Sequence, residues 1–383
     1  MSFGQRVRQL RLMHGMTQAE LADRVLLNQY MLSRIERGEM SCSSETQQML
    51  AVELGVTSDY LHRVPPVPIE THSPLFRARS RVTQRDKHAT HAWANLINEE
   101  YSRLSARNNV IPSQLMPALG TDPAEAAHRT RLALGFNDDE PLPYLVLAAE
   151  RVGVRVLGLP FKVATIDAFC AWHAQTPVVA IMAGVSADRV RWTVAHELGH
   201  LILHQAGQSG KHVEDEADVF ASELLTPRNA LRPTLPRQPN LSNLTMVKTQ
   251  WGVSIKSLVR RCRELGVIDA DRALSLYKQI SKKGWNRNEP GFVPTEKPRG
   301  LRKLAELCYG AGPNLERMAA EAGWSEELTL EILQQHATAN ELPRRPKEAM
   351  VPAAGEENVI YLSERPGRGT ATPTRLSLSA REV

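Results

Sequence analysis

The stretch from Trp192 to His204 most constrains the fold, because it sets two histidines and a glutamate, in the order His-Glu-x-x-His, within a nearly continuous apolar run. The pattern predicts a buried helix, on which His196 and His200 project from one face. Two imidazoles on one face can hold a zinc ion, and buried histidines need polar partners. Glu197 is placed to act as a general base toward water at that ion. The alternative is a pair of hydrogen-bonded core histidines, and a third ligand downstream decides between them.

A carboxylate-rich helix predicted over 214–225 offers that third ligand. Glu214 can complete a His-His-Glu site with one open coordination position. Asp218, on the same face one turn later, can accept a hydrogen bond from a ligand histidine and fix its tautomer. Glu216 lies about 200° around the helix from Glu214, so it becomes the ligand only if the helix starts elsewhere. His204 lies about 12 Å along its helix from the first histidine and is expected at the rim of the site or behind a ligand.

Composition places the chain among ordinary soluble proteins with two or three domains. Of 383 residues, 42% are hydrophobic and 23% charged, and no apolar run is long enough to span a membrane. The N-terminal residues carry no apolar signal-peptide core, so we expect a cytoplasmic protein. The four cysteines are widely spaced and form no Cys-x-x-Cys pair, which fits a reducing compartment and argues against a cysteine-based zinc site. The net charge of +5 permits a nucleic acid partner but is weak support for one.

Residues 1–64 are predicted to form a small domain of five short helices. Amphipathic patterning indicates the first helix, which His14-Gly15 ends. Thr17, followed three residues later by Glu20, has the form of a capping box for the second helix. Asn28 is a good cap for the third. Two further helices follow before the end of this domain.

This domain resembles the lambda-repressor-like (XRE) helix-turn-helix family in the series Gly15-Met16-Thr17-Gln18-x-Glu20-Leu21-Ala22, Leu32-Ser33-Arg34-Ile35-Glu36-Arg37-Gly38 and Leu54-Gly55-Val56-Thr57. The resemblance implies that the third helix enters the major groove of operator DNA, and such domains usually read two half-sites, which favours a homodimer. It implies base contacts from Gln29, Tyr30 and Arg34, phosphate contacts from Gln18 and Arg37, and a DNA face that also includes Thr17, Asn28 and Ser33. Where the family usually has glycine, this chain has Leu26, so that turn must form without glycine's freedom. The alternative is a degenerate domain that dimerises or grips a partner protein.

The remaining chain divides into four predicted regions. Proline-rich residues 65–82 are expected to form a stiff linker. Residues 83–235 are predicted to form a small α+β domain, with helices over 83–107, 122–134 and 142–151 and strands over 152–159, 167–172 and 177–182. A C-terminal helical region, 236–342, and a mostly disordered tail, 343–383, follow, so the chain is mainly α. One basic cluster is either a second DNA-facing surface or a solvated face: Lys256, Arg260, Arg261, Arg263, Lys278, Lys282 and Lys283.

The region of the predicted zinc site is similar to the ImmA/IrrE metallopeptidase family. The resemblance rests on Asp188-Arg189-x-Arg191-Trp192-Thr193-x-Ala195-His196-Glu197-Leu198-Gly199-His200 and on Glu214-x-Glu216-Ala217-Asp218-x-Phe220-Ala221-x-Glu223-Leu224-Leu225-x-Pro227, and it covers most of residues 75–300. Many members have Asn in place of Asp218 and Met in place of Thr226, and neither difference removes a ligand. The resemblance implies a zincin-like domain, one zinc ion and peptidase chemistry. Several members of the family cut a helix-turn-helix repressor.

We therefore interpret the chain as a bacterial DNA-binding transcriptional regulator with a zinc-dependent endopeptidase domain and no membrane partner. His196, His200 and Glu214 would hold the zinc, and Glu197 would transfer a proton from the attacking water to the leaving amine. The substrate would be a separate repressor-type protein, the chain itself, or none. Two alternatives stay open: a transcription factor whose zinc domain is a non-catalytic sensor or structural module, and a toxin–antitoxin or prophage regulator that acts by protein binding.

Overall fold

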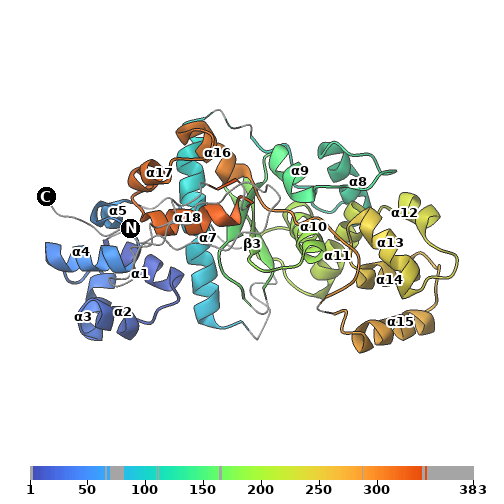
Figure 1. Ribbon diagram of the computed structural model, residues 1–383, viewed down its shortest axis with the longest axis horizontal. Helices are drawn as coiled ribbons and strands as arrows, with labels where there is room; N and C mark the ends of the chain where they lie inside the picture. The colour runs from blue at the N-terminus through green and yellow to red at the C-terminus, as the bar shows by residue number, and fades with distance from the viewer. Residues whose placement is uncertain are drawn as a thin grey trace, which may run out of the picture. The chain divides into compact units, whose positions relative to one another are not determined.

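The computed structural model describes residues 3–64, 67–69, 82–108, 110, 112–163, 166–286, 288–338 and 341–342. The predicted tail and most of the predicted linker lie outside these residues. The described residues form helices and one three-stranded sheet, which confirms a mainly α chain with a small α+β part (Figure 1). Among these residues, no helix combines the length and the apolar character that crossing a membrane requires.

The N-terminal region folds into the predicted five helices: α1 (Phe3–Met13), α2 (Gln18–Arg24), α3 (Gln29–Glu36), α4 (Ser44–Glu53) and α5 (Ser58–His62). The Thr17 hydroxyl accepts a hydrogen bond from the Glu20 N–H and the Glu20 carboxylate accepts one from the Thr17 N–H, which completes the predicted capping box. The Asn28 carboxamide caps α3. Arg11 and Glu36 form a buried bidentate ion pair, at 2.6 and 2.9 Å, that joins α1 to α3.

The turn between α2 and α3 is made by Leu26 in the left-handed region, with φ of +55°. The left-handed conformation costs about 1–2 kcal/mol. The Leu26 side chain is 85% exposed, so its packing offsets little of this cost. We expect Leu26→Gly to raise the free energy of unfolding by about 1 kcal/mol, because the relief of strain exceeds the extra entropy that glycine gives the unfolded chain. Urea denaturation measures the change. Leu26→Ala, which keeps the Cβ, is the control, and a less stable glycine variant would contradict the strain argument.

The middle of the chain contains α7 (Gln84–Ser105), α8 (Pro123–Ala133), α9 (Leu145–Arg151), β1 (Arg155–Leu159), β2 (Ala168–His173), β3 (Thr176–Met182), α10 (Ala187–Leu203), α11 (Lys211–Leu225) and α12 (Arg228–Thr234). Strand β3 lies between β1, to which it is parallel, and β2, to which it is antiparallel. The sequence did not predict α12, because Pro233 within it lacks a backbone N–H and usually ends a helix. The other helices and all three strands were predicted.

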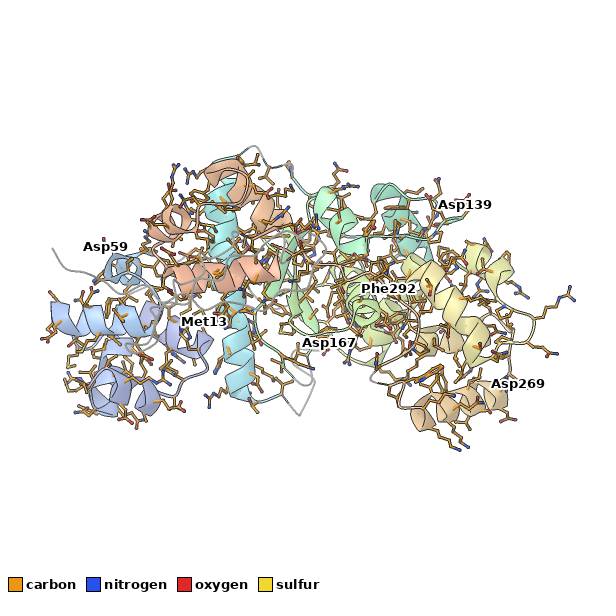
Figure 2. The ribbon with its side chains drawn as sticks, viewed as in Figure 1. Met13, Asp59, Asp139, Asp167, Asp269 and Phe292 are labelled. Carbon is orange, nitrogen blue, oxygen red and sulfur yellow. The ribbon has the colours of Figure 1, made fainter. Side chains whose placement is uncertain are left out.

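Two hydrophobic cores lie on opposite faces of the sheet, because successive side chains of a strand point to opposite sides. Leu157 and Phe169 belong to one core, with the five N-terminal helices, α7, α16 (Gly300–Tyr309), α17 (Leu315–Ala322) and α18 (Glu326–Gln335). Val156 and Cys170 belong to the other, with α8–α12, α13 (Leu241–Trp251), α14 (Ile255–Glu264) and α15 (Ala270–Lys282). Asp269 caps α15 (Figure 2). The C-terminal helical region thus divides between the two cores, and Figure 1 shows α16 beside α7.

The five-helix domain contacts the rest of the described chain through α7 and through the turn between α17 and α18. Arg6 is completely buried and pairs with Glu99 of α7 at 2.7 Å. Val56 and Trp324 form an isolated antiparallel bridge. Backbone hydrogen bonds of 2.9 and 2.8 Å join the residues on either side of this pair. The N-terminal domain therefore shares its hydrophobic core with α7 and the last three helices.

Candidate metal centre and DNA-binding face

Helices α10 and α11 lie side by side and bring the predicted ligands together (Figure 1). Gly199 permits the close approach, since a Cβ at this position would lie 3.2 Å from the Cα of Ala217 and 3.1 Å from a ring carbon of Phe220. Helix α10 is buried along most of its length, as its apolar run predicted. A larger residue than Gly199 would move α11 and its carboxylates away from the two histidines.

The side chains of His196, His200 and Glu214 converge, and their ligand atoms all lie within 4.8 Å of one another. The Nε2 atoms of the two histidines are 3.0 Å apart. Glu214 places Oε2 3.4 Å from Nε2 of His196 and Oε1 3.7 Å from Nε2 of His200. Two ligands bound tetrahedrally at about 2.0–2.1 Å are roughly 3.3 Å apart, so this donor set fits one zinc ion after small adjustments.

Glu216, the alternative ligand, points toward other partners. Its carboxylate lies 3.0 Å from Nε2 of His204 and 3.2 Å from Nε2 of His212. Helix α10 ends at Leu203, and the extended backbone of His204 allows its Nδ1 to lie 3.0 Å from Nδ1 of His200. A proton on Nδ1 of His200 can therefore be donated to His204, which leaves Nε2 of His200 available to a metal.

Asp218 lies behind the other histidine, with Oδ1 3.0 Å from Nδ1 of His196. Burial lowers the pKa of His196, but hydrogen bonds to Asp218 and Glu214 outweigh burial and raise that pKa to about 9. Burial and the neighbouring imidazole lower the pKa of His200. The carboxylates of Asp218 and Glu214 thus stabilise positive charge at this cluster, and they would stabilise a bound cation in the same way.

Arg260 is a part of the site that sequence reasoning missed. Its Nη1 donates to Oδ2 of Asp218 at 2.7 Å, and its Nε donates to Glu264 at 2.8 Å. The next residue, Arg261, is buried and pairs with Glu223. Two members of the predicted basic cluster therefore serve contacts within the fold. No spacing rule links Arg260 to a carboxylate more than forty residues earlier, so only the packing of α14 on α11 reveals the pair.

Glu197 is completely buried and lies against Cys170 of β2. Burial, together with the Glu197 carboxylate, raises the pKa of the Cys170 thiol well above its ordinary value. The thiol therefore keeps its proton and can donate it in a hydrogen bond to the carboxylate. Sequence reasoning missed this contact, because a lone cysteine carries no spacing signal. Strand alternation was the available signal, since it places Cys170 on the face of β2 that packs against α10.

Helix α3 presents the residues predicted to read DNA bases. Gln29 and Tyr30 are exposed, and Arg34 is half-buried with its guanidinium 5.7 Å from the centre of the Tyr30 ring. Arg37 is exposed, pairs with Glu39 at 2.6 Å and donates to the Ser33 hydroxyl at 2.9 Å. These side chains form one polar surface along the helix.

The other predicted DNA contacts also have structural partners. Thr17 and Asn28 use their side chains to cap α2 and α3. Gln18, at the start of α2, donates to Glu36 at 2.8 Å and so joins the buried Arg11–Glu36 pair. These three residues lie at helix N-termini, where backbone N–H groups favour a phosphate.

Known protein families match both the DNA-binding face and the metal centre described above. Residues 7–61 match a family model described as helix-turn-helix, and residues 149–263 match a peptidase family model described as the IrrE N-terminal-like domain. A search of curated proteins finds no match. Among solved structures, a Mycobacterium tuberculosis transcriptional regulator aligns with a TM-score of 0.28 and 17% identity over 44% of this chain. That alignment covers 51% of the mycobacterial chain, so this chain spans about half its length.

The two matches confirm the predicted fusion. The helix-turn-helix match coincides with α1–α5, and the second match contains the His-His-Glu cluster and extends into α14. The chain therefore joins a helix-turn-helix domain to an IrrE N-terminal-like domain and has the domain composition of a DNA-binding transcriptional regulator with a peptidase-type domain.

Proposed function

We propose that this regulator is also a zinc-dependent endopeptidase, which cleaves a repressor-type protein or the chain itself. The observation that carries the proposal is the convergence of two imidazole nitrogens and a carboxylate next to the buried Glu197. In this proposal residues 1–64 bind operator DNA, as a monomer or as a homodimer on two half-sites. Residues 65–82 are the linker, 83–235 the peptidase domain and 236–342 the C-terminal helical region.

His196, His200 and Glu214 would hold one zinc ion with an open coordination position. The ion would supply Lewis-acid chemistry, which polarises the scissile carbonyl and activates water. The Glu197 carboxylate accepts the proton of the attacking water and donates it to the leaving amine. Glu197 is completely buried, so its carboxylate would carry out this transfer in the interior of the protein.

The groups behind the histidines orient them for this task. Asp218 accepts a hydrogen bond from Nδ1–H of His196, and His204 accepts one from Nδ1–H of His200, so both ligands present Nε2. Burial raises the pKa of Asp218, but hydrogen bonds from His196 and Arg260 outweigh burial and lower it. Asp218 therefore stays ionised at neutral pH.

The test of the enzymatic proposal is incubation of the zinc-loaded chain, alone and with a candidate helix-turn-helix repressor, with and without a chelator. We expect fragments that mass spectrometry identifies and that the chelator abolishes. A chain that binds zinc and yields no fragments in either incubation would instead be a regulator whose zinc domain senses or stabilises.

The choice of the third ligand gives a paired prediction. We expect Glu214→Gln to weaken zinc binding by more than about 100-fold, since it replaces a ligand carboxylate. Glu216→Gln should weaken it by about tenfold, since Glu216 acts only through His204. Competition with a chromophoric chelator measures both affinities. The reverse order would make Glu216 the ligand.

Glu39 gives a prediction for the DNA face, because its carboxylate pairs with Arg37 at 2.6 Å and lies 3.8 Å from Arg34. Glu39→Gln frees these guanidinium groups for phosphates, so we expect tighter DNA binding and a salt dependence steeper by about one unit. Fluorescence anisotropy with a fragment of the chain's own promoter measures both. Glu306→Gln makes the same charge change on α16 and should have a smaller effect. Weaker binding by the Glu39 variant would contradict the assigned DNA face.

A further inference from the structure

A pocket of about 340 Å³ opens between α1 of the helix-turn-helix domain and α7. Its apolar wall includes Leu12 of α1, Ala92 of α7, and Val67 and Pro68, which follow the helix-turn-helix domain. No ligand of the zinc cluster lines it. Concave, mainly apolar pockets of this size between two domains commonly bind small organic molecules.

Three polar side chains of α7 that line this pocket are accounted for within the protein. Glu99 accepts hydrogen bonds from Arg6 at 2.7 and 3.0 Å. Asn95 accepts from the Ile69 N–H at 2.6 Å and donates to the backbone carbonyl of His91 at 2.8 Å. Burial lowers the pKa of His91 to about 4, so its ring is neutral at pH 7. The α7 side of the pocket therefore favours an apolar group.

Arg8, at the α1 side of the pocket, differs from these groups. It is exposed and lines the pocket, and it forms no ion pair with any residue that the structure describes. Gln5 and Gln9, which line the same side, are uncharged. A guanidinium group in this position can bind a carboxylate through two parallel hydrogen bonds.

We propose that this pocket binds a small organic acid, with its apolar body between Leu12 and Ala92 and its carboxylate paired with Arg8. The ligand touches a helix of the DNA-binding domain and a helix of the rest of the chain. Its binding therefore holds α1 against α7 and raises the melting temperature of the protein. The inference does not depend on peptidase activity.

The test titrates the full chain with butyrate, hexanoate and 3-phenylpropionate by calorimetry. A chelator is present throughout, because zinc also binds carboxylates. For 3-phenylpropionate we expect a Kd on the order of 0.1–1 mM, given the number of its non-hydrogen atoms. The amide of the same acid, which lacks the charge, should bind at least about tenfold more weakly.

Three variants locate the ligand. Arg8→Met should weaken binding of the acid at least about tenfold and leave binding of the amide unchanged. Leu12→Trp fills the pocket and should abolish binding of both. Arg228→Met removes an exposed arginine elsewhere and should bind as the wild type does. Melting temperatures without ligand check that each variant is folded.

Several results would overturn the proposal. Failure of all three acids to bind excludes the site. Equal binding of acid and amide, or unchanged binding of the acid by the folded Arg8 variant, excludes pairing with Arg8. Full binding by the folded Leu12→Trp variant places the acid outside this pocket.

Discussion

Replacing Glu197 with Gln is expected to reduce peptide cleavage by about 10²–10⁴-fold while zinc binding changes little. Glutamine has nearly the volume of glutamate, and this matters because Glu197 is completely buried. The substitution keeps the shape of this interior side chain, so the packing of α10 on β2 is kept. The variant therefore loses the proton acceptor and retains the fold.

The experiment compares cleavage rates and zinc affinities on the same preparations. The substrate is whichever protein shows chelator-sensitive fragmentation, and Glu125→Gln on the exposed surface of α8 is the matched control. Wild-type rates in the Glu197 variant would rule out its assigned role. Loss of zinc from that variant would show that Glu197 supports the metal site itself.

Replacing Arg191 with Met is expected to lower the free energy of unfolding by about 3–5 kcal/mol, because it removes one partner of a buried ion pair and leaves the other charged. Arg191 is 2% exposed, and its guanidinium pairs with the buried Glu296. It also donates to the backbone carbonyls of Leu142, Pro143 and Gly252. The variant leaves an uncompensated carboxylate and three carbonyls without this donor.

The control for this prediction lies two residues earlier on the same helix. Arg189 pairs with Asp167 at 2.6 Å, but its side chain is 58% exposed, so Arg189→Met should cost less than about 1 kcal/mol. Urea denaturation of both variants, with the zinc content held constant, measures the difference. A second change, Glu296→Leu, should restore part of the stability lost in Arg191→Met. Similar stabilities of the two single variants would contradict the structural role of Arg191.

Local chemistry explains what the sequence predicted well. Thr17 and Asn28 marked helix starts, because a side-chain cap needs only the next three residues. Likewise, the angular positions of Glu214 and Glu216 around the helix predicted over 214–225 were enough to favour Glu214 as the ligand. The structure has Glu214 beside the two histidines. The role of the whole site as a zinc centre stays a prediction.

Tertiary packing explains what the sequence did not predict. Arg260 reaches Asp218, and Cys170 reaches Glu197, only because α14 and β2 pack against the helices of the site. The assignment of α16–α18 to the core of the N-terminal domain is equally non-local. Hydrophobic periodicity shows that these helices have an apolar face, but it does not show which partner covers that face.

The core shared by α1–α5, α7 and α16–α18 has a thermodynamic consequence. Side chains that would be the surface of an independent DNA-binding module are interior here, and the fully buried Arg6 has its carboxylate partner, Glu99, outside that module. The module therefore cannot melt alone without exposing the apolar faces of α7 and α18. Denaturation should disrupt these helices in one cooperative transition. A destabilising substitution in α7 or α18 would therefore also reduce the fraction of molecules in which α3 is folded.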